Sequence, residues 1–172
     1  MAEDLEFTCI DRALVERAAA VMALAERKRL SLVTAESCTG GLIAAVLSEA
    51  PGAADWLHGG FVTYTKENKT IALGVPSELI EHEGIVSEAV ARAMAQGALA
   101  RSPADVAVAI TGVAGPKPDE DGTPVGTVHF AAARRGRAMS HVQYQFGDIG
   151  RGPCRYRGVE QALMLLKQAI ES

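Results

Sequence analysis

The continuous apolar run "DVAVAIT", residues 105–111, constrains the fold more strongly than any other stretch of the sequence. A strand that faces water on one side alternates apolar with polar residues, whereas a strand covered on both faces is apolar throughout. Cover is available, because residues 11–28 and 158–170 carry apolar side chains at helical spacing. The run therefore predicts a central strand between two layers of helices, as in a three-layer α/β/α fold.

The order of the other patterns predicts a mixed sheet. Short runs of β-forming residues at 30–35 and 59–65 are each followed by a helical pattern, as expected for strands that are connected through helices. The runs at 127–134 and 139–146 are joined by the basic turn "RRGR", so they are expected to be antiparallel neighbours. Further helices are expected at residues 42–50, 66–73, 77–83 and 86–102. We expect an α/β fold with a mixed, mostly parallel sheet, in a single domain of residues 1–172 whose residues 1–10 form a flexible N-terminus.

Charge and composition argue against several classes of partner. The 172 residues carry 17 basic and 21 acidic side chains, a net charge of −4, which gives no electrostatic reason to expect nucleic acid or an acidic membrane surface. The N-terminal stretch "MAEDLEF" is acidic where a signal peptide is basic, and no apolar run approaches the roughly 18 residues that span a bilayer. We expect a cytoplasmic protein with no membrane partner and no nucleic-acid partner.

Cysteine and histidine spacing predicts no metal site. Cys9, Cys38 and Cys154 are odd in number and lack the C-x-x-C spacing of zinc sites and redox dithiols, so they are expected to be free thiols. The four histidines lack the H-x-x-x-H and H-E-x-x-H spacings of metal ligands. We expect neither a metal nor another cofactor.

The stretch "TAESCTGG", residues 34–41, lies where the first expected strand leads into a helix. Ligands of α/β sheets bind beyond the carboxyl ends of the strands, so this loop and those after the next two strands are expected to converge. Ser37, Cys38 and Thr39 would lie near a helix start, where free backbone N–H groups favour an anion or a developing oxyanion. Gly40 and Gly41 would let a ligand approach the backbone closely. The alternative is that Ser37 or Thr39 only caps the helix.

A lysine is the expected base for a serine nucleophile in this sequence. A serine without a suitably spaced histidine or aspartate can be activated by a lysine whose pKa is lowered from its usual value of about 10.4. Lys66 and Lys69, which follow the second expected strand, are the candidates. Cys38 is chemically the stronger nucleophile, but without a histidine nearby in sequence it is expected to be a packing thiol.

Five motifs, in order along the chain, carry a resemblance to a known family. They are "TAESCTGG", "GGFVTYTKENK", "GVPSELIEHEGIVSE", "ITGVAGP" and "PVGTVHF". From about residue 11 to residue 171 the chain resembles the C-terminal domain of the competence/damage-inducible protein CinA. In this family the domain also occurs alone, as a nicotinamide-nucleotide amidase.

The resemblance implies deamidation of nicotinamide mononucleotide (NMN) to nicotinate mononucleotide and ammonia, in the recycling of pyridine nucleotides. It also implies self-association into a homo-oligomer. Ser37 matches the nucleophile of the family motif and Lys69 the general base, while Tyr64 would position the substrate or transfer a proton. Together with the loop residues above, the residues expected to bind substrate are Glu36, Thr39, Gly40, Gly41, Thr111, Gly112, Gly115 and Arg155. For Glu36, a structural role in which the carboxylate accepts backbone N–H bonds is an equal alternative.

One stretch departs from the family pattern. Family members usually have a G-D-R-x-x-x-R-like entry to the last helix, and this chain has "GDIGRGPCRYR", with Ile149 in place of the first arginine. Arg151, Arg155 and Arg157 remain as candidates for binding the 5′-phosphate, and the distance from the last helix favours Arg155. The acidic run at 118–122 is expected to be a solvated loop tip or an edge of the site.

The departure keeps two other functions open. One is a catalytically inactive nucleotide-binding or interaction module that has retained the pocket. The other is an amidase that acts on a different carboxamide.

Overall fold

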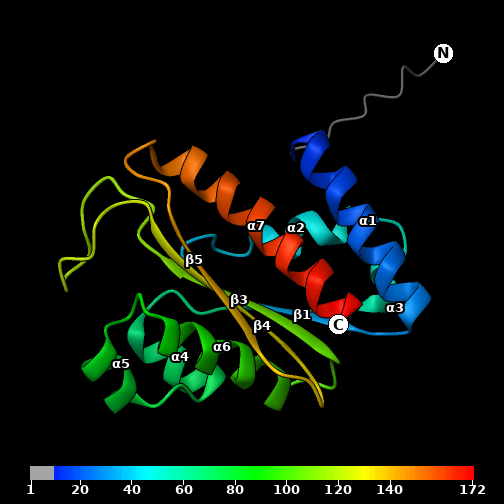
Figure 1. Cartoon of the computed structure of the whole chain (residues 1–172), viewed down its shortest axis with the longest axis horizontal. Helices are drawn as coiled ribbons and strands as arrows, with labels where there is room; N and C mark the ends of the chain where they lie inside the picture. Colours follow the sequence, from blue (N-terminus) through cyan, green and yellow to red (C-terminus); the bar gives the residue numbers. More distant parts are fainter. Residues whose placement is uncertain (1–9) are drawn as a thin grey trace.

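A five-stranded sheet forms the centre of the computed structural model, which describes residues 10–172 (Figure 1). The sheet order is β2-β1-β3-β4-β5. Its strands are β1 (Leu32–Glu36), β2 (Leu57–Val62), β3 (Val106–Gly112), β4 (Thr127–Arg134) and β5 (Ser140–Gln145). Strand β1 pairs in parallel with β2 and β3, whereas β4 pairs antiparallel with both β3 and β5. Four strands therefore share one direction and β4 runs against them, which confirms the expected mixed sheet.

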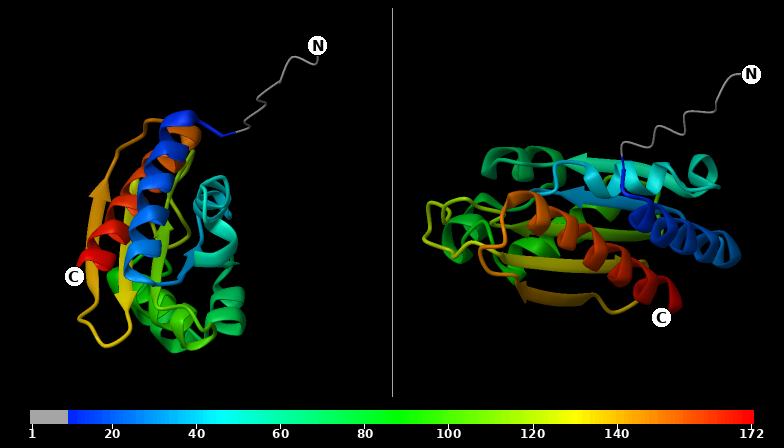
Figure 2. Two further views of the ribbon diagram at one scale, coloured as in Figure 1. Left: turned by 90° about the vertical axis from the view of Figure 1, so that its right-hand side faces the viewer. Right: turned by 90° about the horizontal axis from the view of Figure 1, so that it is seen from above.

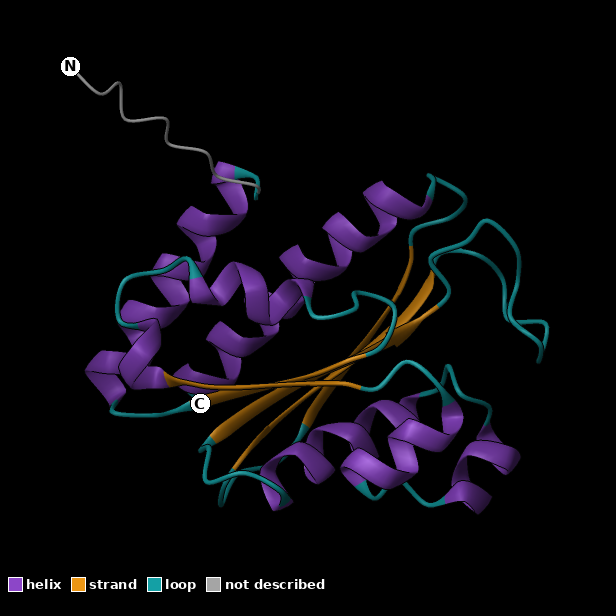
Figure 3. Cartoon of the chain, turned by 180° about the vertical axis from the view of Figure 1, so that it is seen from behind, coloured by secondary structure: helices purple, strands orange, loops and turns teal. Residues whose placement is uncertain are grey.

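Two layers of helices cover the sheet, and this confirms the three-layer α/β/α fold (Figures 1 and 3). Helices α1, α2, α3 and α7 lie on one face, and α4, α5 and α6 lie on the other. Within residues 10–172, no helix has both the length and the apolar composition to cross a bilayer. The helices are α1 (Arg12–Lys28), α2 (Leu42–Ser48), α3 (Ala53–Trp56), α4 (Lys66–Leu73), α5 (Ser77–Glu83), α6 (Glu88–Ala100) and α7 (Arg151–Glu171).

Strand β3 divides the core into two halves, as its apolar run predicts. Val106, Val108 and Ile110 pack on the α1/α2/α7 face, while Ala107 and Ala109 pack on the face covered by α6, and all five are fully buried. The larger side chains fill the layer beneath two long helices, and the alanines let α6 approach the sheet closely. A strand buried on both faces is the physical reason that this run contains no polar alternation.

Two boundaries and one short helix differ from the expectations. Helix α7 begins at Arg151, seven residues before the expected residue 158, so the arginine-rich stretch is helical. Its Pro153 lies in the first turn, where a missing backbone N–H removes no intrahelical bond. Strand β2 ends at Val62, so Tyr64 lies in the loop beyond it, and the short helix α3 was not expected. The expectation of a flexible N-terminus at 1–10 lies outside the described residues except for Ile10.

The loops that follow β1, β2 and β3 meet at one edge of the sheet. In Figure 1 the β3–β4 loop, drawn in yellow-green, and the start of α7, drawn in orange, extend toward the same end of the molecule. The right-hand view of Figure 2 shows the same convergence at its left end, and α1 packs beside α7. Parallel strands end at the same edge, so residues far apart in the sequence are brought together there.

Gly97 sets the distance between α6 and α4. A Cβ atom at this position would collide with the backbone carbonyl of Leu73 at the end of α4. We predict that Gly97→Ala lowers the free energy of unfolding by about 2–4 kcal/mol, because one of two packed backbones must move. Urea unfolding followed by circular dichroism measures the change.

Gly152→Ala is the matched control. It adds the same methyl group to the first turn of α7, where no atom lies within 4 Å of the new Cβ. Its effect is expected to stay within about 1 kcal/mol, in the stabilising direction, because alanine favours helix more than glycine does. Equal effects of the two substitutions would contradict the packing argument.

Candidate active site

Ser37 and Lys69 form a hydrogen-bonded pair at the edge of the sheet. Ser37 directly follows β1, and its backbone N–H donates to the Ile110 carbonyl of β3 (3.1 Å), which fixes the start of the loop. Lys69 lies on α4, and its Nζ donates to Ser37 Oγ (2.9 Å) and to the Thr63 carbonyl (2.7 Å). The Lys69 side chain is fully buried. The structure thus brings together the two residues that the sequence named as nucleophile and base.

Burial makes Lys69 a base that can work near neutral pH. Removing the ammonium group from water disfavours its charged form, and this lowers the pKa of Lys69 to about 8. Once neutral, Nζ can accept the Ser37 hydroxyl proton while an N–H still donates to Thr63. Lys66, the other candidate base, is instead engaged in ion pairs with Glu120 and Asp121, and the hydrogen bond with Glu120 raises its pKa.

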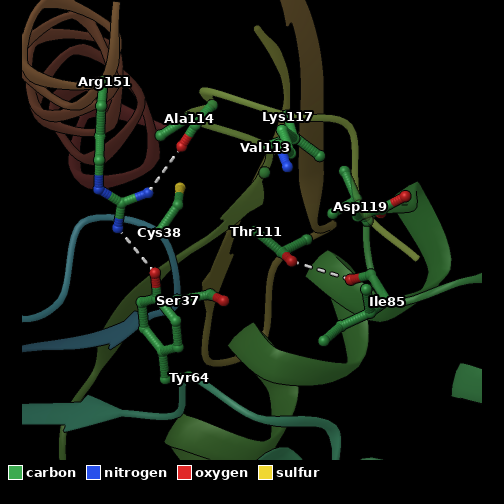
Figure 4. Close-up of a pocket in the computed structure, with 13 residues that line it drawn as sticks. Ser37, Cys38, Tyr64, Ile85, Thr111, Val113, Ala114, Lys117, Asp119 and Arg151 are labelled. Carbon is green, nitrogen blue, oxygen red and sulfur yellow. Dashed lines mark hydrogen bonds between the residues drawn. The ribbon is translucent and has the colours of Figure 1, made fainter. Parts of the chain in front are cut away.

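A cavity of about 220 Å³ opens beside Ser37. Five of the catalytic and substrate-binding residues expected from the sequence line it. They are Ser37 after β1, Tyr64 after β2, Thr111 and Gly112 at the end of β3, and Gly115 beyond it. Figure 4 labels Ser37, Tyr64 and Thr111. Lys69 is not part of the lining, so a ligand in the cavity would meet Ser37 with the amine behind it. This separation keeps the amine out of water while its hydroxyl partner stays accessible from the cavity.

The β3 end of the cavity is shaped by close backbone packing. Thr111 Oγ1 donates to the Ile85 carbonyl (2.8 Å), which ties the loop before α6 to the sheet. A Cβ atom at Gly112 would lie 2.8 Å from Val128 and 2.9 Å from the Thr127 carbonyl, so only glycine fits there. The Thr111 hydroxyl is committed to Ile85 as a donor and retains its lone pairs for a ligand.

Glu36 organises the loop from within and does not face the cavity. Its carboxylate is fully buried and accepts five hydrogen bonds at 2.7–3.0 Å. The donors are the hydroxyls of Thr34 and Thr39 and the backbone N–H groups of Gly41, Ile43 and Ala44. Glu36 therefore has the structural role that the sequence analysis gave as the alternative to substrate binding. It also corrects the expectation that the start of α2 offers free N–H groups to an anion, because Glu36 already occupies them.

The other loop residues serve the turn as well. Thr39 is fully buried and donates to Glu36 (2.7 Å), and Gly40 and Gly41 adopt positive φ angles of 63° and 95°, which glycine adopts without strain. None of the three lines the cavity. Glu36, Thr39, Gly40 and Gly41 were expected to bind substrate. In the structure they instead form the turn and the hydrogen bonds that hold the loop of Ser37 in place.

Arg151, rather than Arg155, reaches the cavity. From the first residue of α7 its guanidinium donates to the Tyr64 hydroxyl (2.7 Å) and to the Gly115 carbonyl (3.1 Å), which joins the loops after β2 and β3 (Figure 4). Arg155 instead donates to the Thr39 carbonyl (2.7 Å) and does not line the cavity, while Arg157 pairs with Glu160. The preference for Arg155 rested on a helix start at residue 158, and the earlier start turns Arg151 toward the site.

Two charged residues of the cavity were not named as site residues from the sequence. Lys117 and Asp119 of the β3–β4 loop both line it. The acidic run at 118–122 was the sequence feature that could have indicated them. Of its carboxylates only Asp119 lines the cavity, whereas Glu120 and Asp121 form ion pairs with Lys66. Sequence alone does not distinguish which side chain of a loop points inward.

The described cysteines behave as packing residues. Burial raises the pKa of Cys38 to about 12, so the thiol stays protonated and is a weak nucleophile despite its place in the cavity wall. Cys38 and Cys154 are free and buried, as expected, and Cys9 lies outside the described residues. In the part of the chain that the structure describes, no three His, Cys, Asp or Glu side chains are grouped to hold a metal ion.

Known proteins are similar to this chain in sequence and in fold. The family model described as the CinA C-terminal domain matches residues 15–170. A putative competence-damage inducible protein of Symbiobacterium thermophilum is 58% identical over 114 residues, which cover 66% of this chain and 26% of that protein. A CinA-like protein of Synechocystis sp. is 42% identical over 156 residues, which cover 90% of this chain and 38% of that protein. The chain thus spans only about a quarter to two-fifths of the length of these relatives.

Solved structures match over nearly the whole chain. The competence/damage inducible protein CihA from Agrobacterium tumefaciens superposes with a TM-score of 0.90 at 41% identity, covering 96% of this chain and 99% of that one. A competence-damaged protein (CinA) superfamily protein from Klebsiella pneumoniae superposes with a TM-score of 0.87 at 35% identity, covering 92% and 98%.

Glu36→Gln tests the support of the Ser37 loop. The amide nitrogen of glutamine must replace one carboxylate oxygen, where it faces donors instead of acceptors. We predict that the free energy of unfolding falls by about 2–4 kcal/mol, since buried N–H groups lose their acceptor. Glu49→Gln, at an exposed position after α2, is the control and should change it by less than about 0.5 kcal/mol. Chemical denaturation measures both, and similar values would contradict the role given to Glu36.

Proposed function

The chain belongs to the family of the CinA C-terminal domain, and on that premise we propose that it is an amidohydrolase that converts NMN to nicotinate mononucleotide and ammonia. The observation that carries the proposal is the buried Lys69 amine 2.9 Å from Ser37 Oγ, at the wall of an open cavity. A lysine held without a carboxylate partner and shielded from water has the properties of a general base for a serine nucleophile.

The first half of the reaction forms an acyl-enzyme. Ser37 Oγ attacks the carboxamide carbon while its proton passes to Lys69 Nζ, and the carbonyl electrons move onto the oxygen. When the tetrahedral intermediate collapses, the C–N bond breaks and Lys69 returns the proton to the departing nitrogen. Ammonia leaves, and the nicotinoyl group remains on Ser37 as an ester.

The second half consumes water. Lys69, again neutral, accepts a proton from a water molecule that attacks the ester carbonyl. Collapse of the second intermediate returns the proton to Ser37 Oγ and releases the carboxylic acid, which ionises in solution. One amide and one water thus give one acid and one ammonia, and the enzyme is restored.

Backbone and side-chain donors near Ser37 match the charges of this reaction. The backbone N–H of Cys38, the residue after the nucleophile, is our candidate for stabilising the developing oxyanion. Arg151 and Lys117 supply positive charge at the cavity for the 5′-phosphate, so the phosphate-binding role moves from Arg155 to Arg151. Tyr64 orients the Arg151 guanidinium through its hydroxyl.

The altered segment "GDIGRGPCRYR" motivated an inactive binding module as the alternative. Arg151, which belongs to that segment, reaches the cavity, and the Ser37–Lys69 pair is intact. Both observations favour an active enzyme over the inactive module. An amidase for another carboxamide would use the same pair, and the charged residues of the cavity favour a substrate that carries a phosphate.

Ammonia release tests the reaction directly. We predict that purified protein releases ammonia from NMN, and that Ser37→Ala lowers kcat by at least about 10³-fold with the fold retained, because no other nucleophile is activated there. Lys69→Met is expected to lower kcat comparably, by removing the base. Circular dichroism confirms that the variants are folded.

Cys154→Ser is the control for these variants. It changes a buried residue that does not line the cavity, and its activity is expected to stay near that of wild type.

Three outcomes would change the proposal. Full activity of Ser37→Ala would overturn the mechanism. NMN binding without ammonia release would favour the inactive module, and release from nonphosphorylated amides in preference to NMN would favour a different carboxamide.

The pKa of Lys69 predicts the pH dependence. The base must be neutral, and with a pKa of about 8 only roughly a tenth of the amine is neutral at pH 7. We therefore expect log kcat/KM to rise with a slope near +1 below pH 8 and to level off above it. A flat profile between pH 6 and pH 8 would contradict the role of Lys69 as base.

A further inference from the structure

Asp119 lines the cavity, and one of its carboxylate oxygens has no hydrogen-bond partner within residues 10–172. Its Oδ1 accepts from the backbone N–H groups of Asp121 (3.1 Å) and Thr123 (2.7 Å), which closes the turn of the β3–β4 loop. Its Oδ2 is buried from solvent and accepts no hydrogen bond within residues 10–172. A buried carboxylate oxygen without a donor is unfavourable, and a ligand that supplies a donor relieves that cost.

The surrounding charges leave Asp119 free to meet a ligand. Glu120 and Asp121, its neighbours in the acidic run, pair with Lys66 at the start of α4 and anchor the loop from outside. The Arg151 guanidinium donates to Tyr64 and Gly115. In the described part of the chain, Asp119 forms no ion pair, so no cation of the cavity neutralises it.

We propose that Asp119 Oδ2 accepts hydrogen bonds from the ribose hydroxyls of the nucleotide substrate. The inference rests on the proposed function, since it takes the substrate to be a mononucleotide. The carboxamide must reach Ser37, and the phosphate carries no donor at neutral pH and belongs with the cations Arg151 and Lys117. The donors that remain are the 2′- and 3′-hydroxyls, and a carboxylate that accepts from ribose hydroxyls is a recurrent feature of nucleotide sites.

The layout of the site fits this order of contacts. Asp119 lies across the cavity from Arg151 and Tyr64 in Figure 4, with Thr111 between them. Ser37 lies on the side of Tyr64. A ligand whose amide meets Ser37 and whose sugar lies toward the β3–β4 loop has its phosphate at the Lys117 end of the cavity.

Asp119→Asn tests the role of Oδ2 separately from that of Oδ1. The asparagine Oδ1 still accepts from Asp121 and Thr123, so the turn is kept, while an NH₂ group replaces Oδ2 and turns an acceptor into a donor. We expect KM for NMN to rise at least tenfold, which corresponds to about 1.4 kcal/mol. With the 2′,3′-dideoxy analogue of NMN, wild type and variant are expected to have the same KM within twofold.

Glu120→Gln is the matched control. It removes the same charge from the same loop, but its side chain pairs with Lys66 and does not line the cavity. Its KM for NMN is expected to stay within twofold of wild type. If Asp119 acted only through its charge, its loss would strengthen the binding of an anionic substrate and lower KM, which is the opposite of the proposed result.

Calorimetric titration of NMN into each protein separates this inference from the proposed reaction. If wild type binds NMN without releasing ammonia, the reaction is refuted, and a tenfold weaker Kd of Asp119→Asn still supports the ribose contact. An unchanged Kd and KM in Asp119→Asn overturn the contact, as does an equal loss with NMN and the dideoxy analogue. A wild type that neither binds nor hydrolyses NMN overturns both proposals. Thermal melting establishes that the variants are folded.

Discussion

The burial of a lysine amine beside the carboxyl end of β1 is the constraint on which the rest of the site depends. Lowering the pKa of Lys69 from 10.5 to about 8 corresponds to roughly 3 kcal/mol of unfavourable free energy at neutral pH. The apolar core on both faces of the sheet must offset that cost. The α4 helix that carries Lys69 is held against α6 at Gly97, and the amine retains acceptors in Ser37 and Thr63. A destabilising buried amine of this kind is expected where activity and stability compete, in agreement with the proposed role of Lys69.

A second buried charge, of opposite sign, supports the nucleophile. Glu36 accepts five hydrogen bonds from the loop and from the start of α2, so the helix N-terminus is satisfied by the protein itself. Because these donors are occupied, anion recognition must come from elsewhere, and the cations nearest the cavity are on α7 and on the β3–β4 loop. The two buried charged residues do not pair with each other. Glu36 fixes the backbone around Ser37, and Lys69 forms a hydrogen bond with the Ser37 hydroxyl.

Much of this organisation could be predicted from the sequence, and the failures have identifiable physical causes. The run at 105–111 predicted the covered central strand, and the family motifs predicted the pairing of Ser37 with Lys69. The start of α7 was missed because Gly152 and Pro153 suggest a break, although the first helical turn accommodates both. The direction of Glu36, inward to the loop instead of outward to a ligand, depends on which N–H groups the folded backbone brings together. The inward turn of Arg151 follows from the same helix start.

The one segment in which this chain departs from the family pattern and the acidic loop both contribute to the rim of the cavity. The segment "GDIGRGPCRYR" contributes Arg151, and the acidic loop contributes Asp119, whereas Ser37 lines the cavity and Lys69 lies buried behind it. A buried pair tolerates little change, because any altered side chain there must be packed and its polar groups satisfied. Rim side chains on a loop and on a first helical turn are under weaker packing constraints, so their charges can differ while the dyad stays in place. Under the proposed function, the rim sets which nucleotide is held, and the buried pair sets what is done to its amide.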